Sequence, residues 1–182
     1  MRKHARSLCR VLRDNIGADV IEVGAEVGVW KGELSRDLLH FFPNLFLHMV
    51  DLWETTKDNI SMHDKDRVGN AMHDAMDAAY RNTEDFSWKR SLVQGLSTEV
   101  ASTFPDSVFD FVFIDADHFY ENVMADVEAW WPKIREGGVM AGHDYNGMGD
   151  RRKGWGVKRA VDEFFLGSEV HVEPGLVWWV KK

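Results

Sequence analysis

The chain has 182 residues, and its 22 Lys and Arg against 30 Asp and Glu give a net charge of −8 with histidine neutral. This length is typical of a single domain spanning residues 1–182, and the acidic balance argues against a nucleic-acid partner, because phosphate contacts need clustered Lys and Arg. No apolar run approaches about 18 residues, and no apolar segment follows the basic N-terminus, so we expect neither membrane association nor a secretory signal. The single cysteine, Cys9, excludes an intramolecular disulfide and fits a cytoplasmic protein.

Strands and helices alternate along the chain. An opening helix carries Leu8, Val11 and Leu12 on its inner face, and a β-branched strand follows at residues 20–29. Further helices are predicted at residues 33–42, 68–80, 97–104 with Ser97 as N-cap, 123–134 ended by Gly137-Gly138, and 157–165. Further strands are predicted at residues 45–50, 91–93, 109–114, 139–142, 170–172 and 177–180. This order predicts an α/β fold, with a doubly wound, mostly parallel seven-stranded sheet, helices on both faces and an antiparallel C-terminal hairpin strand.

Residues 54–85 form the longest stretch without a predicted strand. Their first part, residues 54–66, has no strong period and looks like a loop. We interpret the stretch as a lid or insertion over a binding site, in which His63 and His73 are possible substrate contacts. Met72 and Met76, four residues apart, are more typical of helix packing.

The first strand leads into a glycine-containing turn. The spacing E-x-G-x-x-x-G occurs in two overlapping frames, one at Glu22-Gly24-Gly28 and one at Glu26-Gly28-Gly32. Glycines at such a turn let the backbone approach a ligand, although an ordinary tight turn is the simpler alternative. Asp51 follows the second strand, 23 residues after Gly28, and an acidic residue at about that distance grips ribose hydroxyls in nucleotide-binding sheets. The later frame and Asp51 together predict a nucleoside-bearing ligand.

Carboxylates and imidazoles follow the fourth and fifth predicted strands. Asp115-Ala-Asp117-His118 comes after the fourth strand, and His143-Asp144 comes after the fifth. These strand ends should be neighbours, and two carboxylates with an imidazole suit a divalent metal such as Mg²⁺ or Mn²⁺. The alternatives are that Asp115 caps the next helix and that His143 is an ordinary loop histidine.

Several of these segments occur in the order found in one enzyme family. They are Glu26-Val-Gly28-Val-Trp-Lys-Gly32, Asp51-Leu-Trp53, Gly95-Leu-Ser97, Phe113-Ile-Asp115-Ala-Asp-His118 and Gly137-Gly-Val-Met-Ala-Gly-His-Asp144. Over residues 20–180 the chain resembles class I S-adenosylmethionine-dependent methyltransferases. Within that class it is most similar to macrocin-type sugar O-methyltransferases and more distantly similar to catechol O-methyltransferase.

The resemblance implies a set of cofactor contacts. Glu26, Gly28 and Gly32 would line the methionine and ribose part of S-adenosylmethionine. Asp51 would bind the ribose hydroxyls, and Leu52 or Trp53 would lie against the adenine. The remaining implied contacts are Ser97, at the adenine, and Asp115.

The resemblance also implies the chemistry. Asp115, His143 and Asp144 stand where metal-dependent members bind Mg²⁺, although His143 occupies a place where an acidic residue is common. His118, three residues after Asp115, stands where a general base would deprotonate an acceptor hydroxyl, and Asp115 counts with it as catalytic. The implied function is methyl transfer to a hydroxyl of a small molecule such as a sugar, natural product or catechol, with a homodimer as the expected assembly.

Other functions fit the same scaffold. One is a cephalosporin hydroxylase-like enzyme, because fold does not fix chemistry. Another is a non-catalytic module that binds a nucleoside or S-adenosylmethionine. A nicotinamide-binding domain fits least, because Gly28-Val-Trp-Lys-Gly32 lacks the tight G-x-G that approaches a pyrophosphate.

Overall fold

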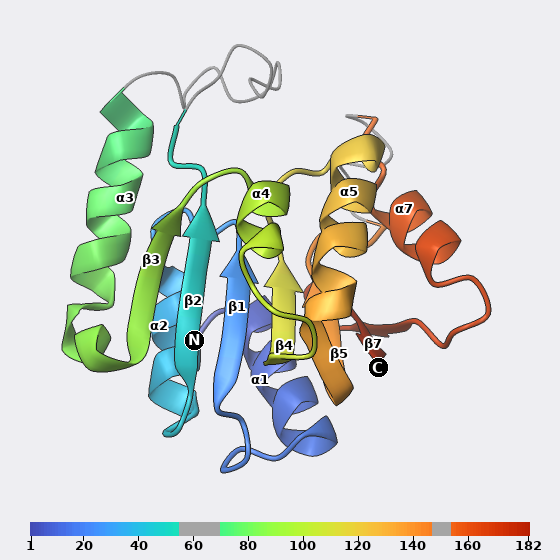
Figure 1. Cartoon of the computed structure of the whole chain (residues 1–182), viewed down its shortest axis with the longest axis horizontal. Coiled ribbons are helices and arrows are strands. Elements are labelled where there is room, and N and C mark those ends of the chain that lie inside the picture. The colour runs from blue at the N-terminus through green and yellow to red at the C-terminus, as the bar shows by residue number, and fades with distance from the viewer. Residues whose placement is uncertain (55–69, 147–153) are drawn as a thin grey trace.

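The computed structural model describes residues 1–54, 70–146 and 154–182. Its centre is a seven-stranded sheet with the strand order β3-β2-β1-β4-β5-β7-β6 (Figure 1). The strands are β1 (Val23–Val27), β2 (Phe46–Asp51), β3 (Arg90–Gln94), β4 (Phe109–Ile114), β5 (Ile134–Gly142), β6 (His171–Glu173) and β7 (Val177–Lys181). The strands β1 to β5 are parallel to one another, while β7 is antiparallel to both of its neighbours, β5 and β6. The predicted fold class is confirmed, including the C-terminal hairpin.

Helices cover both faces of the sheet, as predicted. The helical segments are α1 (Lys3–Asn15), α2 (Glu33–Phe41), α3 (Asn70–Asn82), η2 (Glu84–Lys89), α4 (Ser97–Ser102), α5 (Tyr120–Trp130), η3 (Trp131–Lys133) and α7 (Val157–Phe164). One buried cluster joins α1, α2 and α3 to the sheet, and a second joins α4, α5 and α7 to its other face (Figure 1). Leu8, Val11 and Leu12 are buried in the first cluster, so the predicted inner face of the opening helix is confirmed.

The predicted helix over residues 123–134 is too long at its end. The helix α5 stops at Trp130, and Ile134 is already the first residue of β5. Pro132 explains the early end, because proline lacks the N–H that a continuing helix needs. Gly137 and Gly138 therefore do not end a helix. They lie inside β5, near a shift in its register with β4.

The predicted N-cap at Ser97 is also wrong. Leu96 occupies the N-cap position of α4, and Ser97 is the first residue of the helix. The Ser97 hydroxyl is used elsewhere, because Trp130 Nε1 donates a hydrogen bond to it at 2.9 Å.

The proposed lid lies partly outside the described residues. Residues 55–69, with His63, are not described, whereas α3 and η2 run beside β3 at one edge of the sheet (Figure 1). His73 on α3 is exposed. Among the residues that are described, no helix is both long and apolar enough to cross a membrane.

Candidate functional site

The turn between β1 and α2 holds the later of the two glycine frames. Gly28 and Gly32 lie in this turn, whereas Gly24 lies inside β1. Gly28 has a φ of +93°, and a Cβ there would come within 2.3 Å of the Asp115 carbonyl oxygen. Gly32 has a φ of +71°, and a Cβ there would lie 3.0 Å from Ala79 Cα of α3. The two glycines therefore let the turn pack closely against backbone of the same chain, at Asp115 and at Ala79.

The Asp51 carboxylate connects the turns after β1 and β2. Its Oδ2 accepts the backbone N–H of Trp30 at 2.8 Å, and its Oδ1 accepts the backbone N–H of Trp53 at 2.8 Å. Both tryptophans have positive φ, +55° and +41°, which is uncommon for bulky residues. Trp53 Nε1 also donates to the Trp30 carbonyl at 2.8 Å. Asp51 thus fixes the backbone around the place where the resemblance puts the ribose.

Glu26 is a buried acid beneath this turn. Its side chain is almost fully buried, and the Ser35 hydroxyl of α2 donates to its Oε2 at 2.5 Å. Burial raises the pKa of Glu26 to about 8, against the opposing effect of the Ser35 hydrogen bond. The carboxyl is therefore mostly protonated at neutral pH in the ligand-free protein.

Ser97 lies beside the same turns. The backbone N–H of Gly95 donates to the Asp51 carbonyl at 3.1 Å, and Gln94 Nε2 donates to the Leu52 carbonyl at 3.2 Å. These bonds hold the start of α4 against residues 51–52. The structure therefore brings Asp51, Leu52 and Ser97 to one end of the sheet, where the resemblance expects the nucleoside.

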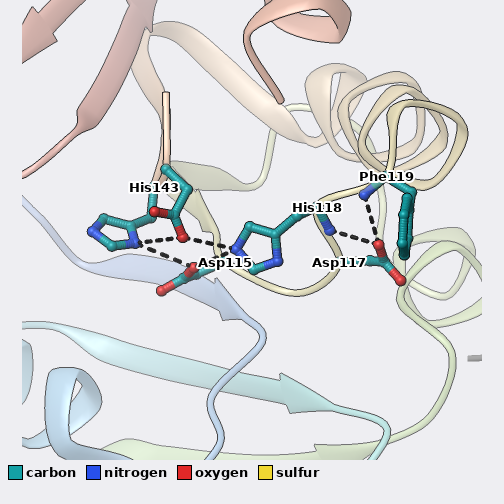
Figure 2. A network of polar contacts seen from close by, with 6 residues as sticks. Asp115, Asp117, His118, Phe119 and His143 are labelled. Atoms are coloured by element: carbon teal, nitrogen blue, oxygen red, sulfur yellow. Dashed lines mark hydrogen bonds and ion pairs between the residues drawn. The ribbon is translucent and has the colours of Figure 1, made fainter. Parts of the chain in front are cut away.

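The acidic and imidazole residues after β4 and β5 form one cluster (Figure 2). His118 Nε2 lies 2.9 Å from Asp144 Oδ2 and 3.7 Å from Asp115 Oδ1. His143 Nδ1 lies 3.3 Å from Asp144 Oδ2 and 3.6 Å from Asp115 Oδ1. All four side chains are between one-fifth and three-tenths exposed. The sequence prediction that the ends of β4 and β5 bring these residues together is confirmed.

The cluster carries two positive and two negative charges at neutral pH. Burial lowers the pKa of each histidine, but contacts with Asp115 and Asp144 outweigh it, raising the pKa of His118 to about 9 and that of His143 to about 10. Burial opposes ionisation of the two carboxyls, but the histidines outweigh it and lower the pKa of Asp115 and of Asp144. The four charges therefore cancel within the cluster.

Asp117, not Asp115, accepts hydrogen bonds from the backbone of the turn that leads into α5. Its Oδ1 accepts the backbone N–H groups of His118 at 2.6 Å and Phe119 at 2.7 Å (Figure 2). Phe119 holds the N-cap position of α5 without a side-chain cap bond, so the alternative that Asp115 caps this helix is wrong. With Asp117 in this role, Asp115 is left to face the histidines.

Two rings that the sequence did not assign to the cluster pack on its histidines. The Trp155 ring stacks on His118 with 4.1 Å between centroids and an interplanar angle of 24°. The Gly156 N–H donates to the His118 carbonyl at 2.8 Å, which holds the same segment in place. On the other side, the His4 ring of α1 lies 5.0 Å from that of His143. No local pattern around His4 signals this contact, which arises from the packing of α1.

The cluster provides donors for a cation. Asp115, His118 and Asp144 each offer one ligand atom, and these atoms all lie within 4.8 Å of one another. Two carboxylate oxygens and an imidazole nitrogen fit a divalent cation that accepts mixed ligands, such as Mn²⁺, better than Mg²⁺, which favours oxygen alone. The resemblance places His143 in this set, and His143 adjoins it. A small pocket lies here, lined also by Val123, Val157 and Trp178.

Comparisons with known proteins identify the family of the chain and its fold. The chain matches a family model described as a methyltransferase domain over residues 25–145, which include the ends of β1 to β5. None of the curated proteins that were compared with the chain matches it.

Solved structures share the fold at low sequence identity. A putative caffeoyl-CoA O-methyltransferase from Staphylococcus aureus is 15% identical with a TM-score of 0.70, over 100% of this chain and 84% of that one. The O-methyltransferase NovP is 17% identical with a TM-score of 0.69, over 98% and 79% of the two chains. The calicheamicin methyltransferase CalS11 is 19% identical with a TM-score of 0.66, over 96% and 77%.

Proposed function

The chain belongs to the family of methyltransferase domains whose model it matches, and on this premise we propose that it methylates a hydroxyl group of a small molecule such as a sugar, natural product or catechol. The family implies S-adenosylmethionine as the methyl donor. The O-methyltransferases among the structural neighbours support a hydroxyl acceptor. The net charge of −8 supports a small molecule over a nucleic acid.

The cofactor would occupy the end of the sheet formed by the turns after β1, β2 and β3. When bound, S-adenosylmethionine supplies a methyl group activated by its sulfonium sulfur. Asp51 fits the ribose hydroxyls, because a carboxylate accepts hydrogen bonds from hydroxyl groups and its bonds to the Trp30 and Trp53 N–H groups hold it at this turn. Glu26 lies beneath the same turn, and a sulfonium or ammonium group bound beside it would favour the ionised form of its carboxyl.

His118 would act on the acceptor. Its Nε2 lies between Asp115 and Asp144, at the end of β4 that adjoins Gly28. To accept the hydroxyl proton, His118 must first be neutral, because a protonated imidazole has no free lone pair. Its role is therefore to take the proton at Nε2 while Trp155 holds the ring in place.

A divalent cation bound in the cluster would be compatible with His118 acting as the base. Asp115 and Asp144 would hold it with His143 as a further ligand, which leaves His118 Nε2 for the proton. Its positive charge would favour an ionised acceptor oxygen and a neutral imidazole nearby.

The observation that carries the proposal is the cluster itself. Two carboxylates and two imidazoles at the ends of adjacent strands lie directly across Gly28 from the turn held by Asp51. A donor bound at the turn would therefore be next to a group able to accept a proton. Efficient methyl transfer needs this alignment of the methyl group and the nucleophile.

The proposal is tested in two steps. Calorimetry should show that the wild-type protein binds S-adenosylhomocysteine, and thermal shifts with Mg²⁺, Mn²⁺ and EDTA should show whether a cation adds stability. A panel of small-molecule hydroxyl acceptors is then assayed for S-adenosylhomocysteine formation. With an acceptor found, His118→Ala should lower turnover by about a hundredfold or more, with cofactor affinity nearly intact.

A matched control separates the possible outcomes. His40→Ala, on the exposed side of α2, should leave turnover unchanged. Unchanged turnover in His118→Ala would remove the base role from this residue. Cofactor binding without turnover of any acceptor would point to a non-catalytic binding module, and binding of neither ligand would reject the proposal. Light scattering checks the predicted homodimer.

A further inference from the structure

The backbone that follows β5 passes twice through the left-handed region. Asp144 has a φ of +56° and Asn146 has a φ of +57°. Residues other than glycine keep this conformation only where the surrounding structure enforces it. Because Asp144 carries one of the two carboxylates of the cluster, whatever holds this turn also places that carboxylate.

Tyr145, between these two residues, anchors the turn at two points. Its backbone N–H donates to the Leu176 carbonyl at 3.1 Å, which ties the turn to the connection between β6 and β7. Its hydroxyl donates to Asp162 Oδ1 of α7 at 2.5 Å. The turn is therefore held by a backbone bond on one side and by a side-chain bond on the other.

Lys158, one turn before Asp162 on α7, fixes the direction of the side-chain bond. Its Nζ forms an ion pair with Asp162, and it lies 3.3 Å from the Tyr145 hydroxyl oxygen and 5.0 Å from the centroid of the Tyr145 ring. A carboxylate only accepts hydrogen bonds and an ammonium group only donates them. The hydroxyl proton must therefore point to Asp162, while the hydroxyl oxygen faces Lys158.

The same end of α7 also contacts His118. The Gly156 N–H donates to the His118 carbonyl at 2.8 Å, and the Trp155 ring stacks on the imidazole. This part of the chain therefore contacts both partners of the 2.9 Å contact between His118 and Asp144. It contacts His118 directly and reaches Asp144 through Tyr145.

We propose that Asp162 is a positioning residue that holds the Asp144 carboxylate opposite His118 through its bond with the Tyr145 hydroxyl. Without this bond, the turn can leave the left-handed conformation at Asp144, and the carboxylate moves away from His118 Nε2. Asp162 itself touches neither cofactor nor acceptor. The inference rests on the proposed function only for its effect on turnover, because the contact at Nε2 can be measured without an acceptor.

Proton NMR of the full chain at pH 7 reports this contact. Because the Asp144 carboxylate only accepts, His118 Nε2 must carry the proton between them, and a hydrogen-bonded imidazole N–H resonates far downfield of the backbone amides. The wild-type protein should show this resonance, and its absence from His118→Ala identifies it. In Tyr145→Phe and in Asp162→Ala the resonance should disappear, because the freed N–H exchanges its proton with water.

Two further variants separate the hydroxyl bond from other effects. Asp162→Asn should keep the resonance, because the amide oxygen still accepts the Tyr145 proton although the charge opposite Lys158 is gone. Tyr80→Phe removes an exposed hydroxyl from α3, at the other edge of the sheet, and should also keep it (Figure 1). An unchanged resonance in Tyr145→Phe and Asp162→Ala, or no resonance in the wild type, would overturn the inference. Its loss from Asp162→Asn would also overturn it, because charge and not the hydroxyl bond would then hold the turn.

Turnover gives a second readout once an acceptor is known. Asp162→Ala should lower kcat about tenfold, because a small displacement of a reacting group lowers the rate steeply, while the affinity for S-adenosylhomocysteine stays as in the wild type. Asp162→Asn should restore most of kcat. A weaker cofactor affinity with an unchanged kcat would contradict the positioning role. Failure of the wild-type protein to bind S-adenosylhomocysteine would instead reject the proposed function, and the NMR result would still decide the inference.

Discussion

His118 Nε2 lies 2.9 Å from Asp144 Oδ2, and this contact joins the loop after β4 to the residue after β5. Asp144 has a φ of +56°, a backbone conformation that aspartate tolerates better than most residues. The charge-assisted bond holds this turn closed, so the geometry of the cluster and the shape of the backbone depend on the same pair.

Asp144→Asn should therefore destabilise the protein. The substitution removes the charge opposite His118 and His143, leaving Asp115 as their shared carboxylate. We expect a loss on the order of 2 kcal/mol in the free energy of unfolding, measured by urea denaturation at pH 7. Glu163→Gln removes an exposed partner of Arg159 on α7 and should change stability little. Equal effects of the two variants would contradict a structural role for the His118–Asp144 contact.

Asp51→Ala should weaken cofactor binding through the backbone as well as through the ribose. Its two carboxylate oxygens hold the backbone N–H groups of Trp30 and Trp53, both at positive φ. Without them we expect S-adenosylhomocysteine affinity to fall about tenfold to a hundredfold, the equivalent of one or two charged hydrogen bonds.

Calorimetry checks this, with Glu54→Gln as the control. Glu54 is exposed, three residues beyond Asp51, and its substitution should leave the affinity as in the wild type. An Asp51→Ala protein that binds the ligand as tightly as the wild type would remove Asp51 from the site.

Much of the site could be predicted because parallel strands place their carboxyl ends at one edge of the sheet. Each apolar strand is visible in the sequence, and the residue after it is therefore placed with little ambiguity. This is why Asp51, Asp115 and the His143-Asp144 pair are brought to the same end of the molecule, as expected. The order of the strands predicts which residues lie close together, and it does not predict which of their atoms form hydrogen bonds.

The contacts that the sequence did not predict join segments far apart in the chain. The stacking of Trp155 on His118 and the packing of His4 on His143 depend on how α7 and α1 dock, which no local period encodes. Two signals were nonetheless present. Asp126 falls between Val123 and Trp130 on the buried stripe of α5, where an acid is out of place, and Pro132 marks the end of that helix before Ile134.

Glu26 should make the stability of the folded protein fall as the pH rises. The pKa of this carboxyl is raised from 4.5 to about 8 in the folded state, so the folded protein binds its proton more tightly than the unfolded chain. The resulting stability is complete below about pH 4.5 and is lost as the pH rises toward 8.

Glu26→Gln should remove this dependence. Between pH 5 and pH 8, the free energy of unfolding of the wild type should therefore fall by on the order of a few kcal/mol relative to that of the variant. Urea titrations of both proteins across this range check it, since the difference cancels other titrating groups. A constant difference would show that Glu26 is already ionised in the folded protein.

Gly28→Ala tests how tightly the turn after β1 packs on the end of β4. A Cβ would lie 2.3 Å from the Asp115 carbonyl oxygen, and that oxygen belongs to the backbone and cannot swing away. We expect a loss of about 3 kcal/mol or more in the free energy of unfolding.

The matched control is Gly167→Ala, which has almost the same φ of +91° but no atom within 4 Å of the new Cβ. That variant carries only the strain of a left-handed backbone, about 1–2 kcal/mol, so the difference between the two measures the close approach of β1 and β4 itself. Equal losses in both would mean that the turn after β1 can move away from Asp115. The distance between this turn and the cluster at the ends of β4 and β5 would then not be fixed by their packing.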